Sequence, residues 1–227
     1  MKIAEIFYSI QGEGILAGVP SVFVRSSGCN LRCSWCDTPY TSWKPEGAEM
    51  PVGAIVEEVR RFPASHAVIT GGEPMLFEET VELTGALKNL GMHVTIETAG
   101  TVYRPVACDL MSISPKLANS TPIEREGGRF AALHDRLRYQ PEVLRRLMAE
   151  HPYQLKFVVA DASDLDEIHA IIQETAADPS RVVLMPEGTS SAVLKQRSLW
   201  LVDLCKAQGF RYGPRLHVDL WGDRRGV

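Results

Sequence analysis

Short apolar segments alternate with helical segments through most of the chain, and this alternation constrains the fold more than any other feature. Val- and Ile-rich runs predict strands at residues 1–9, 21–25, 67–69, 92–96, 109–113, 154–160 and 181–184. Amphipathic runs predict helices at residues 52–62, 78–90, 141–150, 164–175 and 192–208. Strands that are apolar on both faces and are joined by helices form a parallel sheet.

The alternation falls short of a complete barrel. A (β/α) barrel with all its strands takes about 250 residues, whereas this chain has 227. Helices are missing from the pattern after residue 38 and between Gly100 and Asp109. We therefore expect an α/β fold, an open, partial TIM-type (β/α) barrel with mainly parallel strands, built by a single domain over residues 1–227.

The charge balance limits the partners that this domain can have. Its formal net charge is −4, whereas a surface for nucleic acid or membrane would show a basic excess. The first residues contain no signal-peptide cleavage site of small residues, and no apolar run approaches the ~18 residues of a spanning helix. We expect a cytoplasmic protein with a small-molecule ligand and no direct contact with nucleic acid or membrane.

Polar residues gather where the predicted strands end. In barrels of parallel strands, the carboxyl ends of the strands meet at one mouth, which holds the active site. The stretches expected to converge there are Arg25 with the cysteine loop at residues 28–38, Thr70 to Glu73, Glu97 with Thr98, Ser114 to Lys116, and Met185 to Gly188.

Three of the five cysteines lie within eight residues, at Cys29, Cys33 and Cys36. This CxxxCxxC spacing lets one loop surround a single metal centre. A structural zinc site wants four protein ligands, whereas a 4Fe-4S cluster held by three cysteines leaves one iron open. Zinc, or a disulfide with a spare thiol, remains an alternative; Cys108 and Cys205 are expected to pack as small hydrophobic residues.

Other candidate positions each allow a structural and a functional interpretation. The turn from Ile10 to Gly14 is either a plain reverse turn or a close contact with a ligand. Arg25 either forms a surface ion pair or holds a substrate carboxylate through two hydrogen bonds. The Gly71-Gly72-Glu73 stretch either brings backbone close to a ligand or simply begins a helix.

Two segments lack a regular pattern. Residues 117–139 are mixed and charged, and we expect a surface loop with one short helix. The last residues, by position alone, are expected to fray. The six histidines show no paired spacing and are expected to be structural or exposed.

The cysteine spacing resembles the cluster loop of the radical S-adenosylmethionine (SAM) enzymes, and the Gly-Gly-Glu stretch at residues 71–73 resembles the motif by which they grip the SAM amino group. Over nearly the whole chain the motifs resemble the 7-carboxy-7-deazaguanine synthase family. They are Ile10 to Gly14, Arg25, the loop ending Trp35-Cys36-Asp37-Thr38, residues 70–74, Glu97-Thr98, Ser114-Pro115-Lys116, and the terminus with Leu220-Trp221-Gly222 and Arg225-Gly226-Val227.

The resemblance implies a homodimeric lyase of the queuosine and deazapurine pathways, which supplies tRNA modification. Such an enzyme rearranges 6-carboxy-5,6,7,8-tetrahydropterin to 7-carboxy-7-deazaguanine and releases ammonia. It uses a 4Fe-4S cluster, SAM and Mg²⁺. The cluster receives its electron from a donor such as a flavodoxin or a ferredoxin.

The resemblance also implies roles for individual residues, carried over by position. Cys29, Cys33 and Cys36 would hold the cluster, and Thr38 would bind magnesium. The SAM site would comprise Trp35, Cys36, Asp37, Gly71, Gly72, Glu73, Glu97, Thr98, Ser114, Pro115, Lys116, Met185, Pro186, Glu187 and Gly188. The pterin would contact Ile10, Gln11, Gly12, Glu13, Arg25, Thr70 and Val227, with Arg25 and Thr70 taking catalytic roles and with Leu220 and Trp221 anchoring the tail.

Met185-Pro186 departs from the Gln-Pro often present at this point in the family, so contacts with SAM there are expected to run through the backbone. Two other functions remain open from the sequence. A radical SAM activase for a partner protein shares the cysteine and Gly-Gly-Glu motifs. A metal-binding or redox-sensing module would need the cysteines alone and would not cleave SAM.

Overall fold

One open sheet organises the chain, and the computed structural model describes all of residues 1–227. The strand order is β3-β1-β2-β4-β5-β6-β7-β8-β9, and the edge strands β3 and β9 do not pair with each other, so the sheet is open. The strands are β1 (Lys2–Ile10), β2 (Pro20–Ser26), β3 (Ala48–Glu49), β4 (His66–Gly71), β5 (His93–Thr98), β6 (Leu110–Ile113), β7 (Tyr153–Val159), β8 (Val182–Pro186) and β9 (Arg211–Tyr212). The expected open, partial barrel is confirmed.

The first strand departs from the parallel arrangement. β2 and β4 to β9 pair in parallel, whereas β1 pairs antiparallel with both β2 and β3. The connection from β1 to β2 spans only residues 11–19, which is too short for a crossover that would make two strands parallel. The sequence did not predict β3 or β9, which have two residues each.

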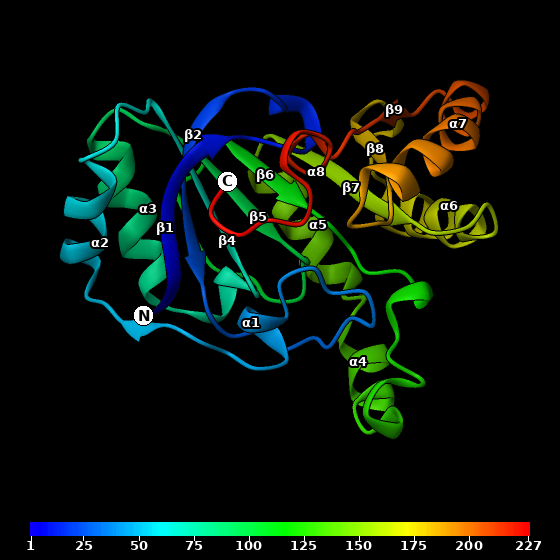
Figure 1. Ribbon diagram of the computed structural model, residues 1–227, viewed down its shortest axis with the longest axis horizontal. Helices are drawn as coiled ribbons and strands as arrows, with labels where there is room; N and C mark the ends of the chain where they lie inside the picture. Colours follow the sequence, from blue (N-terminus) through cyan, green and yellow to red (C-terminus); the bar gives the residue numbers. More distant parts are fainter.

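Five long helices follow the curve of the sheet on its outer side (Figure 1). They are α2 (Val52–Val59), α3 (Glu79–Asn89), α5 (Pro141–Glu150), α6 (Asp164–Thr175) and α7 (Ser191–Gln208). The structure confirms all five predicted helices, and α5 and α6 have the predicted bounds. No helix combines the length and the apolar composition needed to cross a bilayer.

Short elements fill the segments that lacked a pattern. They are α1 (Pro39–Ser42), α4 (Ala131–Leu137) and α8 (Leu216–Trp221), with 3-10 turns at Gly14–Leu16, Pro74–Leu76, Ala118–Ser120, Arg125–Gly128 and Pro179–Arg181. The segment at residues 117–139 therefore holds two turns besides the expected short helix. In Figure 1, α4 extends from the body of the molecule, beside the loop that carries α1.

The core lies between the sheet and the outer helices. Side chains on a strand alternate between its two faces. In β2, Val22 and Val24 are fully buried in the main hydrophobic cluster, whereas Phe23 and Arg25 line a cavity on the opposite face. The same alternation recurs in the parallel strands that follow, so one face of the sheet packs on helices and the other builds a site.

Candidate active site

A cavity of ≈ 510 Å³ opens on the inner face of the sheet. This volume falls within the ~300–1,000 Å³ of typical small-molecule sites. Polar side chains reach it from successive parallel strands, at inward positions between residues of the core: Arg25 on β2, Thr70 on β4, Glu97 on β5, Ser112 on β6 and Lys156 on β7.

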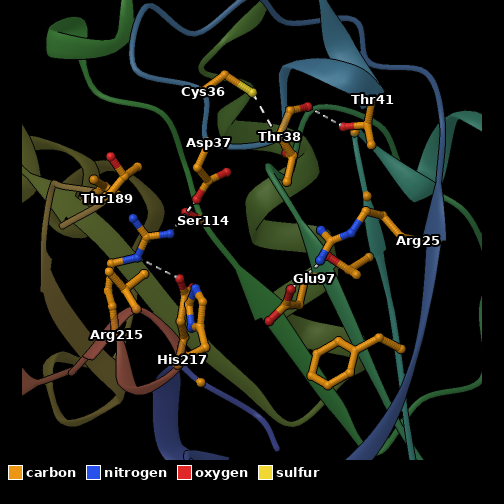
Figure 2. Close-up of a pocket in the computed structure, with 18 of the residues that line it drawn as sticks. Arg25, Cys36, Asp37, Thr38, Thr41, Glu97, Ser114, Thr189, Arg215 and His217 are labelled. Atoms are coloured by element: carbon orange, nitrogen blue, oxygen red, sulfur yellow. Dashed lines mark hydrogen bonds and ion pairs between the residues drawn. The ribbon is translucent and has the colours of Figure 1, made fainter. Parts of the chain in front are cut away.

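The cavity collects most of the predicted site residues. Figure 2 shows Arg25 and Glu97 on one side of it and Asp37, Arg215 and His217 on the other. The predicted residues in its lining are Ile10, Gln11, Gly12, Glu13, Arg25, Cys29, Cys33, Trp35, Cys36, Asp37, Thr38, Thr70, Gly71, Gly72, Glu97, Thr98, Ser114, Lys116, Met185, Glu187 and Val227. Four others lie outside the lining: Glu73, Pro115, Pro186 and Gly188.

The cysteine loop leaves the end of β2 and is held by hydrogen bonds from several segments. The Trp43 indole N–H donates to the Cys33 carbonyl at 3.0 Å, and the Ser34 amide donates to the Ser120 carbonyl at 2.8 Å. Gly72 packs against the loop so closely that a Cβ there would lie 2.2 Å from the Gly28 carbonyl oxygen. Gly72 thus admits the backbone of the loop as well as facing the cavity.

The three thiols suit a cluster better than a single ion. No group of three or more His, Cys, Asp or Glu side chains is arranged to hold one metal ion, as the zinc alternative would require. In a cluster each cysteine binds a different iron, so the sulfurs need not meet at one point. In the metal-free chain burial raises the pKa of Cys29 and of Cys33 to about 12, and metal binding must therefore release their protons.

The segment at residues 117–139 supports the cysteine loop. The sequence predicted only a surface loop with one short helix there. Ser120 and His134 are buried. The Arg32 amide donates to Nδ1 of His134 at 3.0 Å, and the Ser120 hydroxyl lies 2.9 Å from its Nε2. These contacts between the segment and the loop are polar, so they leave no hydrophobic period in the sequence.

Glu73 does not face the cavity. It is fully buried, and its carboxylate accepts from the Thr98 hydroxyl and the Ala99 amide at 2.8 Å and from the Met75 amide at 3.1 Å. Burial raises the pKa of Glu73, and these hydrogen bonds act in the opposite direction. In this structure Glu73 joins the ends of β4 and β5 and thereby shapes the wall of the site.

Buried ion pairs form the floor of the cavity. The Lys156 side chain is 6% exposed; it pairs with Glu13 and lies 3.8 Å from Glu97. Arg215 is 7% exposed; it pairs with Glu13 at 3.1 Å and also with Asp37. Burial opposes the charge on Glu13, but the two cations hold its pKa well below the usual range.

Glu97 also orders the predicted pterin residues. It accepts from the Thr70 hydroxyl at 2.8 Å and from Nε2 of Gln11 at 3.1 Å. Oε1 of Gln11 in turn accepts from the Glu13 amide at 3.1 Å. Both ends of the Gln11 amide are therefore engaged within the protein, and Glu97 retains acceptor capacity toward the cavity.

Arg25 is held by Glu5, its partner residue across the β1–β2 ladder. Nε of Arg25 donates to Glu5 at 2.7 Å, and the Tyr40 hydroxyl donates to the same oxygen at 2.8 Å. Arg25 forms an ion pair, as one interpretation expected, and also lines the cavity.

The C-terminal tail follows α8 back to the cavity, and the tail residues 222–227 all contribute to its lining. Arg225 holds the tail through Glu5 at 3.1 Å and Glu46 at 3.0 Å. Leu220 and Trp221 are 55% and 40% exposed, whereas Val218 is 2% exposed. The expectation that Leu220 and Trp221 anchor the tail is wrong, since both are exposed; Val218 is the buried apolar residue of α8, and Arg225 makes the polar contacts of the tail.

The remaining predicted SAM residues divide between lining and support. Lys116 donates to both oxygens of Ser114 at 2.8 Å and stands over the Trp35 ring at 6.0 Å. Met185 lines the cavity and is 3% exposed as a residue. Glu187 pairs with Arg197, and the Gly188 carbonyl accepts from Arg215.

Several lining residues were not predicted from the sequence: Tyr40, Ser112, Lys156, Arg215 and His217. Lys156 carried a usable signal, because a lysine within an apolar strand must either face a site or find a buried partner. Arg215 carried none, since its partner Glu13 lies 202 positions away.

Comparisons with known proteins identify relatives of the chain. A sequence model of the radical SAM superfamily matches residues 23–120. Over 98% of its length the chain is 49% identical to the 7-carboxy-7-deazaguanine synthase of Halobacterium salinarum, and it covers 91% of that protein. It is 42% identical to the 7-carboxy-7-deazaguanine synthase of Rhodopirellula baltica, over all of this chain and 89% of the relative.

Solved structures with lower identity share the fold. The crystal structure of QueE from Escherichia coli matches with a TM-score of 0.69 at 24% identity, over 93% of this chain and 92% of that one. Streptococcus suis SuiB bound to its precursor peptide matches with a TM-score of 0.57 at 15% identity, over 84% of this chain and 47% of that one.

Proposed function

The chain belongs to the 7-carboxy-7-deazaguanine synthase family of radical SAM enzymes, and on that basis we propose how its cavity serves the reaction. The protein is a lyase that converts 6-carboxy-5,6,7,8-tetrahydropterin to 7-carboxy-7-deazaguanine in queuosine and deazapurine biosynthesis. This membership replaces the activase and the metal-sensing alternatives.

One observation carries the proposal: the three clustered cysteines open onto the same cavity as Arg25, Thr70 and Glu97. Cys29, Cys33 and Cys36 would hold the 4Fe-4S cluster, with SAM bound beside it. When bound, the reduced cluster and SAM supply the radical chemistry that abstracts a hydrogen from the substrate. The protein's own groups bind the pterin, orient it and exclude water.

Arg25 would orient the substrate carboxylate. Its guanidinium suits a carboxylate geometrically, and Glu5 and Phe7 restrict it, the latter with its ring centroid 5.6 Å from the guanidinium carbon. A misplacement of about 1 Å can cost ~100-fold in rate. The Arg25–Glu5 pair therefore acts as a preformed clamp.

Glu97, Thr70 and the tail would bind the rest of the pterin. The aminopyrimidinone edge presents N–H donors, which a carboxylate such as Glu97 can accept. We place Glu97 on the pterin side because it bonds Thr70 and Gln11. Trp35, Gly72, Ser114 and Met185 remain to line the SAM side.

Magnesium, a dimer and an electron donor complete the proposal. The Thr38 hydroxyl would bind Mg²⁺, with waters and the substrate carboxylate at the other positions. A homodimer is supported by exposed apolar side chains on the neighbouring helices α7 and α8, where Leu199 is 73% exposed and Leu220 is 55% exposed. A flavodoxin or a ferredoxin would supply the electron.

The test is anaerobic reconstitution with iron and sulfide, followed by SAM, dithionite, Mg²⁺ and 6-carboxytetrahydropterin, with the product identified by mass and ultraviolet spectrum. We expect the wild type and Cys108→Ala to form the deazaguanine acid, because Cys108 lies outside the cavity lining. Cys33→Ala is expected to form none. Product formation by Cys33→Ala, or its absence with the wild type, would overturn the proposal.

A further inference from the structure

The residues that follow the cysteine loop, at the end of α1, fold back against it. The Thr41 carbonyl accepts from the Gly28 amide at 2.8 Å. The Trp43 indole N–H donates to the Cys33 carbonyl at 3.0 Å. Because these two contacts hold the chain on both sides of residue 42, the position of that residue relative to the loop is fixed.

Ser42 occupies this position, and its hydroxyl lies 3.2 Å from Sγ of Cys36. Ser42 is 3% exposed, and its hydroxyl has no other hydrogen-bond partner in the protein. Buried hydroxyl groups nearly always have a partner. The sulfur of Cys36 is therefore the atom that satisfies the Ser42 hydroxyl.

The direction of this hydrogen bond changes when a metal is bound. Between a thiol and a hydroxyl either atom can donate. A cysteine that binds metal is a thiolate, which has lone pairs and no proton, so the Ser42 hydroxyl must then be the donor. The Thr38 hydroxyl lies 3.9 Å from the same sulfur (Figure 2), which is too far for a strong hydrogen bond.

A second sulfur of the loop also accepts a hydrogen bond, but from the backbone. Sγ of Cys29 accepts from the Leu31 amide at 3.3 Å. Any residue other than proline could supply that donor at position 31, whereas the bond to Cys36 depends on the side chain of Ser42. A substitution at residue 42 can thus remove one hydrogen bond to a cluster ligand and leave the backbone of the loop unchanged.

We propose that Ser42 raises the reduction potential of the 4Fe-4S cluster through its hydrogen bond to Cys36. Hydrogen bonds to the sulfurs are among the factors that set the potential of such clusters. Reduction transfers one electron from the external reductant, a flavodoxin, a ferredoxin or dithionite, to the oxidised cluster, and no bond forms or breaks. The added negative charge strengthens the hydrogen bond, because a donor stabilises an anionic acceptor more strongly.

This inference rests on the proposed function, in which Cys36 holds the cluster. Ser42 acts on the cluster through Cys36, so it is a positioning residue and not a catalytic one. The consequence for the reaction is that the cluster accepts its electron more readily from a given reductant. The reduced cluster is in turn a weaker donor to SAM, so the hydrogen bond sets a balance between the two electron transfers.

Ser34 offers a matched control within the same loop. Its hydroxyl donates to the Asn119 carbonyl at 3.4 Å and contacts no cysteine sulfur. Ser34→Ala therefore removes the same atom as Ser42→Ala does, without removing a hydrogen bond to a cluster ligand. Ser42→Thr keeps a hydroxyl at residue 42 and shows whether that group restores the wild-type potential.

The first readout is the reduction potential. Each protein would be reconstituted anaerobically with iron and sulfide and titrated potentiometrically without SAM or pterin, with the reduced cluster measured by electron paramagnetic resonance. We expect Ser42→Ala and Ser42→Gly each to lower the equilibrium constant for reduction ~3- to 10-fold. This corresponds to ~30 to 60 mV, at about 59 mV per tenfold for one electron. Ser34→Ala and Ser42→Thr should titrate as the wild type does.

The second readout observes the hydrogen bond itself in the oxidised cluster. Iron–thiolate stretching bands in the resonance Raman spectrum respond to hydrogen bonds at sulfur, because such partners alter the metal–ligand bond. Transfer of the wild type from H2O to D2O should shift these bands. Part of the shift should be absent in Ser42→Ala and present in full in Ser34→Ala.

The outcomes separate this inference from the proposed function. A wild type that holds the cluster and forms no deazaguanine acid would refute the proposed function, whereas a lowered potential in Ser42→Ala would still support the role of Ser42. Equal potentials in wild type and Ser42→Ala would refute that role alone, as would an equal shift in Ser34→Ala. A lower iron content in Ser42→Ala, with an unchanged potential of the remaining cluster, would assign Ser42 to cluster assembly and also overturn the inference.

Discussion

Charged side chains are paired on one side of the cysteine loop and unpaired on the other. On the cavity side, Lys156 and Arg215 both pair with Glu13, and their side chains are almost completely buried. On the outer side, Arg32 and Arg129 stack on a ring and pair with no carboxylate. A buried charge is tolerated only when it is paired and hydrogen-bonded, whereas an exposed charge carries no such requirement. The inner charges can therefore fix geometry, whereas an exposed outer charge such as Arg129 needs no carboxylate partner.

The largest effect is expected from Lys156→Met, which removes a buried cation from between Glu13 and Glu97. The substitution leaves Glu13 and Glu97 with less compensation in a buried site. Removing one partner from a buried ion pair costs about 3–5 kcal/mol. We expect the free energy of unfolding, measured by urea denaturation of the metal-free protein, to fall by about that amount.

Lys206→Met is the control for Lys156→Met. Lys206 pairs with Asp203 on the surface, where both side chains are more than 70% exposed. Surface pairs contribute about 0–1 kcal/mol, so this variant should unfold near the wild-type midpoint. If both lysine variants lost the same free energy of unfolding, buried ion pairs in this protein would contribute no more to stability than surface ion pairs do.

A pH effect of intermediate size is expected from His134, which supports the outer side of the loop. Burial, together with the cation of Arg138, lowers the pKa of His134 to about 4 from an ordinary 6.5. Between these values the unfolded chain binds a proton that the folded chain does not. The free energy of unfolding should therefore decrease as pH falls from 6.5 toward 4, by at most about 3 kcal/mol from this group.

The difference between wild type and His134→Gln isolates that contribution. The glutamine oxygen can still accept from the Arg32 amide, as Nδ1 of His134 does, but it does not titrate. Denaturation midpoints measured from pH 7 to pH 4 should fall less steeply in the variant. Parallel curves for the two proteins would mean that His134 titrates alike in the folded and unfolded states.

Much of the fold followed from local pattern. Helices α5 and α6 have the predicted bounds because amphipathic period, an N-terminal proline at Pro141 and acids in the first turn of α6 all agree with the helix. The convergence of polar strand ends also followed, since parallel strands present their carboxyl ends at one edge. These properties depend on neighbouring residues.

The rest of the site depends on contacts between distant residues. Glu13 meets Lys156 and Arg215 across 143 and 202 positions, and no local spacing encodes such pairs. The support that Ser120 and His134 give the cysteine loop is polar, so hydrophobic periodicity could not detect it. Likewise, the sequence allowed Glu73 either to meet a ligand or to begin a helix, and no local pattern shows that Thr98, Ala99 and Met75 donate to its carboxylate.

The smallest effect is expected from Arg225→Ala, which tests an ion pair between a half-exposed cation and a largely buried carboxylate. Arg225 is 44% exposed, yet one of its partners, Glu5, is 13% exposed and also holds Arg25. Its loss should cost stability only about 0.5–1 kcal/mol. Because the tail lines the cavity, the same loss should raise the KM for the pterin about two- to fivefold, the factor to which about 0.5–1 kcal/mol corresponds.

A readout without turnover separates the role of Arg225 in the tail from general destabilisation. Carboxypeptidase should release Val227 faster from Arg225→Ala than from the wild type, because the contacts to Glu5 and Glu46 no longer hold the tail against the sheet. Arg60→Ala, which removes a surface pair with Glu57 in which the side chains are 58% and 69% exposed, should change neither KM nor the release of Val227. If release of Val227 were unchanged in Arg225→Ala, α8 alone would hold the tail. The ion pairs of Arg225 with Glu5 and Glu46 would then contribute nothing to holding it.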